Sequence, residues 1–197
     1  RRHRLRAGGE VTGSGALVAD RHRLAEARGE VLETMDPTRR LGRLEPQEGT
    51  PLTGDVSGLR PRALSAVAAE ALGIGDRALE LGVEHARTRE QFGRPIGVYQ
   101  AVSHKLADTY VETQLARSLT YWAAWCVAED DAQAPLAAAA AKAYAADAAV
   151  AACERSIQVL GGIGFTWEHV LHRYYKRAQW IQAFGGFAAA QRSEVAE

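Results

Sequence analysis

From residue 62 to about residue 88, apolar side chains recur at steps of three and four residues. The stripe consists of Leu64, Val67, Ala71, Ile74, Ala78 and Leu81. This spacing places the apolar side chains on one face of an α-helix, and no run with a period of two follows residue 60. Gly73 and Gly75 interrupt the stripe, and each costs about 1 kcal/mol relative to Ala in a helix interior. We therefore expect a neighbouring helix to approach closely at both glycines.

Three more helices are predicted after the first. The second closes near Asp130 and follows Val102, Leu106, Tyr110, Thr113, Arg117, Thr120 and Ala124. The third occupies the alanine-rich run Ala134–Ala152 and continues to Gly161-Gly162, because alanine is the best helix former and glycine commonly ends helices. The fourth runs from about Glu168 to about Phe184. Long helices with short junctions predict an all-α fold, a four-helix antiparallel bundle over residues 59–197.

Residues 1–58 have a different character. They contain many Gly, Arg and Pro residues and no sustained helical period. The stretch Val11–Val18 is typical of a strand or hairpin piece, and Asp36-Pro37 is typical of a turn. We therefore expect a short irregular or β segment before the bundle.

The composition bears on several classes of function. Lys plus Arg and Asp plus Glu each total 24 in 197 residues, so no basic excess indicates nucleic-acid binding. Cys126 and Cys153 lie in helical runs without CxxC spacing, which favours free buried thiols in a reducing cytoplasm. The apolar run Ala134–Ala141 is shorter than the ~18–20 residues of a membrane span. A cytoplasmic protein without a membrane segment is expected.

Two junctions between the predicted helices carry distinctive strings. The first is Thr88-Arg-Glu-Gln-Phe-Gly-Arg-Pro-Ile-Gly-Val-Tyr-Gln100, and the second is Gln158-Val-Leu-Gly-Gly-Ile-Gly-Phe-Thr-Trp-Glu-His169. Together they resemble the carboxy-terminal domain of acyl-CoA dehydrogenases, and the resemblance covers roughly residues 59–184. Leu32–Arg40 resembles the end of the family's middle β-domain. The resemblance therefore implies that residues 1–58 are a partial remnant of that domain or a linker.

The resemblance implies FAD as cofactor, bound across a subunit interface. Arg89 would lie beside the diphosphate, where a guanidinium can form paired hydrogen bonds with anionic oxygens. Phe92 would pack on apolar parts of FAD, and the second junction would contribute Gln158 and the backbone of Gly161 and Gly162. Taken singly, an Arg after a helix is usually a terminal charge, and a Gly-Gly pair is usually a helix stop. The family's assemblies imply a homo-dimer or tetramer, or a hetero-oligomer with a catalytic family member.

The family's reaction needs a base that removes a proton from the α-carbon of an acyl-CoA thioester. Most members carry a Glu-Gly-Thr string near the end of the last long helix. The corresponding residues here are Phe184-Gly-Gly-Phe187, so Gly185 stands at the base position and Phe187 at that of a flavin-contacting Thr. Ala63 stands at the alternative base position. The catalytic residue therefore stays unknown, with Glu70, about 10 Å further along the same helix, as a weak candidate beside its interpretation as a structural Glu.

A metal site is not expected. His169 and His172 are three residues apart, but no HExxH pattern or further ligand set accompanies them. Three functions stay open. The chain is an acyl-CoA dehydrogenase-family flavoprotein, incomplete as given and active with missing residues or a partner subunit. Alternatively, it is a non-catalytic subunit that contacts a partner's FAD, or a flavin-free relic recruited to another reaction.

Overall fold

The computed structural model describes residues 9–11, 17–19, 28–39, 41–45 and 57–196. The chain divides into two compact units, residues 1–60 and 61–197. In the first unit, β1 (Gly9–Val11) pairs antiparallel with β2 (Leu17–Ala19), and β3 (Arg28–Leu32) pairs antiparallel with β4 (Leu41–Glu45). The turn after β3 is held by Asp36, whose Oδ1 accepts hydrogen bonds from the backbone N–H and the hydroxyl of Thr38 at 2.9 and 2.6 Å. The predicted short β segment is confirmed in these residues.

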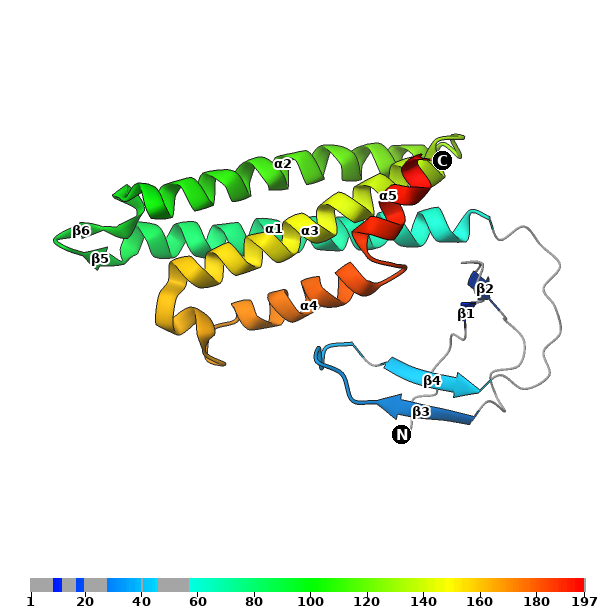
Figure 1. Cartoon of the computed structure of the whole chain (residues 1–197), viewed down its shortest axis with the longest axis horizontal. Coiled ribbons are helices and arrows are strands. Elements are labelled where there is room, and N and C mark those ends of the chain that lie inside the picture. Colours follow the sequence, from blue (N-terminus) through cyan, green and yellow to red (C-terminus); the bar gives the residue numbers. More distant parts are fainter. Residues whose placement is uncertain (1–8, 12–16, 20–27, 40, 46–56, 197) are drawn as a thin grey trace. The chain divides into compact units, whose positions relative to one another are not determined.

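The second unit is helical (Figure 1). Its long helices are α1 (Leu59–Thr88), α2 (Gln100–Ala128) and α3 (Ala134–Leu160), followed by α4 (Leu171–Ala183) and the short α5 (Ala188–Ala196). The predicted four-helix bundle is confirmed, and α5 is an addition that the sequence pattern did not predict. Helix α4 begins three residues later than expected, because an extended residue at 166 ends the 3-10 helix η2 (Gly161–Phe165) and a short loop follows.

The alanine-rich α3 is the central helix. Most of its residues are buried, because alanine allows neighbouring helices to pack at short interaxial distances. Ser156 on α3 donates a hydrogen bond to the carbonyl of Ala78 on α1 at 2.7 Å. The segment Ala134–Phe165 is long and apolar enough to cross a membrane by length and composition alone. Its burial inside the bundle is that of a core helix in a soluble protein.

Close approach of helices involves a different glycine from the two expected. A Cβ added at Gly73 would meet nothing within 4 Å, and at Gly75 it would make only ordinary contact with Thr113. The prediction for Gly73 was therefore wrong. At Gly82, in contrast, a Cβ would lie 2.9 Å from Ser156 Oγ and 3.0 Å from Leu106 Cδ2. Gly82 lets α1 approach α2 and α3 closely.

Half-buried ion pairs also link the helices. Arg155 on α3 forms two hydrogen bonds with the carboxylate of Glu112 on α2, at 2.7 and 2.8 Å. Arg117 on α2 donates to both carboxylate oxygens of Asp76 on α1, at 2.8 and 2.7 Å. Beside these contacts, α2 keeps large exposed apolar side chains, each more than half exposed: Tyr110, Val111, Leu115, Tyr121 and Trp125.

Candidate functional site

A small hairpin connects α1 and α2. Strands β5 (Glu90–Gln91) and β6 (Arg94–Pro95) pair antiparallel and are followed by the 3-10 helix η1 (Ile96–Val98). The turn residues Phe92 and Gly93 both have positive φ angles, 55° and 76°, as a tight two-residue hairpin turn requires. Such a φ is uncommon for a bulky residue. The side chain of Phe92 is 91% exposed, so the hairpin presents an aromatic ring outward.

The base of this hairpin fixes Arg89. The backbone N–H of Arg89 donates to the carbonyl of His85 at 2.8 Å, and the carbonyl of Arg89 accepts from the N–H of Ile96 at 2.8 Å. These bonds hold the backbone, while the side chain of Arg89 is exposed. Arg94 lies over the ring of Tyr99 at 4.9 Å and donates to its hydroxyl at 3.3 Å. The sequence-predicted guanidinium and aromatic ring therefore both stand on one exposed, backbone-braced hairpin.

The second junction exposes backbone at the end of α3. Gly161 has φ 64° and ψ −136°, a conformation that is essentially restricted to glycine. Its N–H donates to the carbonyls of Gln158 and Ile157 and so closes the helix. A Cβ added at Gly161 or Gly162 would meet nothing within 4 Å. The backbone of both glycines therefore has open space beside it. Gly164 serves packing instead, because its Cβ would lie 2.5 Å from the carbonyl oxygen of Ile157.

Both junctions lie at the same end of the bundle (Figure 1). His85 on α1 lies within electrostatic range of a residue from each junction. The pKa of His85 is lowered by burial first, and then by the positive charges of Arg89 and His169. The hairpin and the second junction thus bring basic groups into electrostatic range of one another. An anionic group at this end of the bundle would be attracted by the guanidinium of Arg89.

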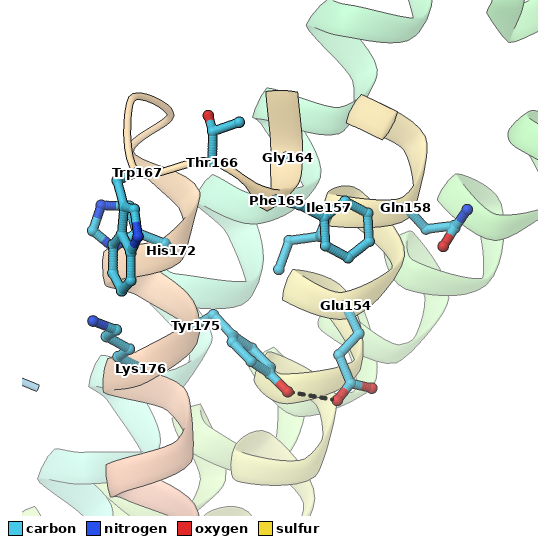
Figure 2. Close-up of a pocket in the computed structure, with 10 residues that line it drawn as sticks. All are labelled: Glu154, Ile157, Gln158, Gly164, Phe165, Thr166, Trp167, His172, Tyr175 and Lys176. Atoms are coloured by element: carbon cyan, nitrogen blue, oxygen red, sulfur yellow. Dashed lines mark hydrogen bonds between the residues drawn. The ribbon is translucent and has the colours of Figure 1, made fainter. Parts of the chain in front are cut away.

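A cavity of about 390 Å³ lies beside the second junction, between the end of α3, η2 and α4. Figure 2 shows its lining residues: Glu154, Ile157, Gln158, Gly164, Phe165, Thr166, Trp167, His172, Tyr175 and Lys176. Gln158 is the one predicted cofactor residue among them, and its side chain extends away from the Trp167 side of the cavity. Arg89, Phe92, Gly161 and Gly162 do not line this cavity.

The wall opposite Gln158 is aromatic and basic. Trp167 makes an edge-to-face contact with His172 at 4.9 Å between ring centres, and the ammonium of Lys176 lies 4.1 Å from the centre of the Trp167 ring. Tyr175 donates a hydrogen bond to Glu154 at 3.0 Å. Trp167 and Lys176 were missed by reasoning from the sequence. The nine-residue separation of Trp167 and Lys176 matches no simple helical spacing, because the loop before α4 intervenes.

The two histidines considered for a metal have separate contacts. His169 Nδ1 accepts a hydrogen bond from the N–H of Leu171 at 3.2 Å and so satisfies a donor at the start of α4. His172 packs against Trp167, and its buried Nδ1 has no hydrogen-bond partner among the described residues. Within the described part of the chain, no group of three or more His, Cys, Asp or Glu side chains is arranged to hold a metal.

The usual base positions contain no carboxylate. Gly185 has φ +65°, and a Cβ added there would lie 3.2 Å from Leu64 Cδ2 on α1. Leu64 is buried, so a side chain at residue 185 would require Leu64 to shift by a few tenths of an ångström. Ala63 is half-buried. The carboxylate of Glu70 forms an ion pair with Arg177 on α4 at 3.2 Å, a contact that favours the structural interpretation of Glu70.

Comparisons with known proteins give a consistent result. Residues 63–197 match the family model described as acyl-CoA dehydrogenase, C-terminal domain. Acyl-CoA dehydrogenase IpdE2 of Mycobacterium tuberculosis is 46% identical over 145 residues, which cover 74% of this chain and 43% of that protein. The chain thus spans less than half the length of this relative.

Two solved assemblies share the fold. The Tcur3481-Tcur3483 steroid ACAD G363A variant matches with a TM-score of 0.81 and 32% identity, over 91% of this chain and 50% of that one. The ChsE4-ChsE5 complex of Mycobacterium tuberculosis matches with a TM-score of 0.81 and 31% identity, over 92% of this chain and 51% of that one. Each of these assemblies joins two different proteins.

Proposed function

Because the chain belongs to the acyl-CoA dehydrogenase family, we propose that it contributes a FAD-contacting surface to an enzyme that α,β-dehydrogenates an acyl-CoA thioester. We further propose that the base comes from outside the two usual positions of this sequence, from a partner subunit or from other residues of the same protein. The observation that carries this proposal is a contrast between two parts of the bundle. The side chains expected to contact FAD are exposed, whereas the usual position of the base has no carboxylate and lies against a buried leucine. Arg89 and Phe92 face outward, whereas Leu64 occupies the space beside Gly185.

The exposed residues fit the adenosine diphosphate half of FAD. The guanidinium of Arg89 would bond the diphosphate, while Phe92 would pack on an apolar part of the cofactor. Gln158 supplies an amide, and the open backbone of Gly161 and Gly162 permits close approach. When bound, FAD accepts the β-hydride of the substrate. This chain's own residues would bind and orient the cofactor from one side, and the neighbouring subunit would hold the other side.

The proposal includes assembly. The exposed apolar side chains of α2 would be covered in an oligomer, since a group of large exposed apolar side chains on one helix often marks an interaction site. The Tcur3481-Tcur3483 and ChsE4-ChsE5 assemblies each join two different proteins, which supports a hetero-oligomer with a catalytic family member, and a homo-dimer or tetramer is the alternative. Residues 1–58 would then be a partial remnant of a middle β-domain or a linker. A cytoplasmic location is part of the same proposal, supported by the family.

The cofactor contact is tested by FAD titration of an Arg89→Ala variant. A hydrogen bond to a charged group contributes about 1.5–3 kcal/mol, so FAD affinity should fall by roughly 10–100-fold. Arg87→Ala is the matched control, because it removes an exposed Arg one half-turn earlier on α1 without changing the hairpin. Equal FAD affinity in the wild-type protein and in the Arg89→Ala variant would exclude this placement of the cofactor.

The origin of the base is tested by dye reduction with an acyl-CoA. The isolated chain should turn over slowly, since loss of a general base typically costs about 10²–10⁴-fold. Mixing with a catalytic family partner should restore the rate. Strong activity of the isolated chain that disappears in Glu70→Ala would identify Glu70 as a relocated base. Strong activity that survives Glu70→Ala would contradict the proposal.

A further inference from the structure

The turn between α4 and α5 follows an unusual backbone path. It comprises residues 184–187, and Gly185 and Gly186 have φ angles of +65° and +101°. Three carbonyls at this turn point toward the interior of the bundle, those of Gln182, Gly185 and Gly186. The ammonium of Lys142 on α3 donates to the carbonyl of Gln182 at 3.1 Å and also to that of Gly186. The side-chain amide of Gln191 on α5 donates to the carbonyl of Gly185 at 2.6 Å.

Both donors are fully buried. Lys142 and Gln191 each have 0% exposure, which is rare for either residue type. A buried ammonium is costly unless it is paired or fully hydrogen-bonded. Two carbonyls offset that cost: that of Gln182, in the last turn of α4 and at the negative end of the helix dipole, and that of Gly186, in the turn that follows the helix. The arrangement therefore depends on both partners: the turn stabilises the buried charge of Lys142, and Lys142 fixes the turn.

Lys142 and Gln191, with the carbonyls that accept their hydrogen bonds, are here called the clamp. The clamp holds the backbone of the turn and does not depend on a side chain at residue 185. Because a trans peptide is planar, a carbonyl that points inward directs the next N–H outward. The inward carbonyl of Gly186 therefore directs the N–H of Phe187 outward, and the Phe187 side chain is 60% exposed. A substitution that released Lys142 would let the carbonyls rotate and would move Phe187.

We propose that Lys142, together with Gln191, is a positioning residue that fixes where the 184–187 turn faces the acyl thioester. The inference rests on the proposed function, and it takes the acyl group to lie beside residue 185, the position at which the resemblance implies the family's base. The clamp keeps the turn in one conformation although residue 185 carries no catalytic base. Phe187 and the Gly185 backbone then form a fixed wall of the acyl site. Lys142 touches neither the acyl group nor FAD in this arrangement.

The experiment measures two affinities on the FAD-loaded protein in its native assembly. FAD affinity is measured by titration, and octanoyl-CoA affinity by the change it causes in the flavin spectrum. Lys142→Met removes the charged donor at nearly the same volume, and Gln191→Leu removes the second donor. Arg192→Ala is the matched control on α5, because it breaks an exposed ion pair with Asp147 and removes no hydrogen bond donated to the carbonyls of Gln182, Gly185 or Gly186. Hydrogen–deuterium exchange of residues 184–191 reports on the turn itself.

The expected result is a loss of about tenfold in octanoyl-CoA affinity for Lys142→Met, the scale for a charged hydrogen-bond donor, with unchanged FAD affinity. Gln191→Leu should act in the same direction, and Arg192→Ala should change neither affinity. If Lys142→Met does not fold, Gln191→Leu decides alone. Unchanged octanoyl-CoA affinity with faster exchange at the turn overturns the inference, as does an equal loss of both affinities. Failure of the wild-type protein to bind FAD would instead overturn the proposed function.

Discussion

Substitution at Gly185 should reduce stability, although the family's base stands at this position. In Gly185→Ala, an L-residue would be forced to adopt φ +65°, which costs about 1–2 kcal/mol. The added Cβ would also press on Leu64 Cδ2 at 3.2 Å, and buried Leu64 has little room to move. The free energy of unfolding should therefore fall by at least ~1–2 kcal/mol, which lowers the Tm of a protein of this size by about 2–8 °C. Gly185→Glu should show the same loss or more.

Differential scanning calorimetry measures this change, with Gly73→Ala as control. Gly73 is an exposed helical glycine where an added Cβ meets nothing within 4 Å, so the control should gain up to ~1 kcal/mol of stability. Opposite signs for the two Gly→Ala variants are the expected outcome. An unchanged Tm for Gly185→Ala would show that the turn does not have the backbone path described here. Strong acyl-CoA oxidation by Gly185→Glu in the isolated chain would show that only a carboxylate was lacking.

Three further predictions concern other parts of the bundle. Burial raises the pKa of the Cys153 thiol to about 12, so iodoacetamide at pH 8 should label it only after unfolding, and rapid labelling of the folded protein would contradict its burial. The lowered pKa of His85 means that the unfolded state binds more protons, so stability should fall as pH drops below the ordinary His value of 6.5. In thermal melts, His85→Phe should flatten that part of the pH dependence; an unaltered profile would count against it. Trp125→Ser should weaken self-association in sedimentation velocity, whereas a monomeric wild-type protein at micromolar concentration would refute the interface on α2.

The helices could be predicted because each depends on local periodicity. The stripe that begins at Leu64 gave the course of α1, and Gly161 marked the end of α3 correctly. The sequence pattern extended α4 back to Glu168, because it cannot show that the loop before Leu171 follows an extended path. Likewise, the close helix contact at Gly82 depends on Ser156, a residue far away in the sequence, so helix propensity alone did not identify Gly82.

Part of the candidate site could be proposed from the sequence because its residues lie in recognisable local strings. Arg89 and Gln158 belong to ordered strings at helix junctions, and such strings can be recognised without coordinates. The partner of Glu70 could not be predicted, since Arg177 lies on another helix and is brought close only by tertiary packing. Lys142 follows a run of alanines, and no sequence pattern marks it as a residue with a buried ammonium. Its burial follows from the position of the turn after α4, which depends on how α3, α4 and α5 pack together.

Helix α3 takes part in both the proposed FAD contact and the proposed acyl contact. The two contacts can be separated by experiment because they lie far apart along this helix. Gln158 lies at the C-terminal end of α3 and Lys142 lies 16 residues earlier (158 − 142), which corresponds to about 24 Å along a helix. Sites separated by more than about 10 Å and without shared partners usually behave independently. A change at Arg89 should therefore act on FAD alone, and a change at Lys142 should act through the turn alone. A subunit that binds FAD from one side and does not abstract a proton can keep the FAD contact at Arg89. Its turn beside the acyl group can meanwhile have a different structure, built around Gly185.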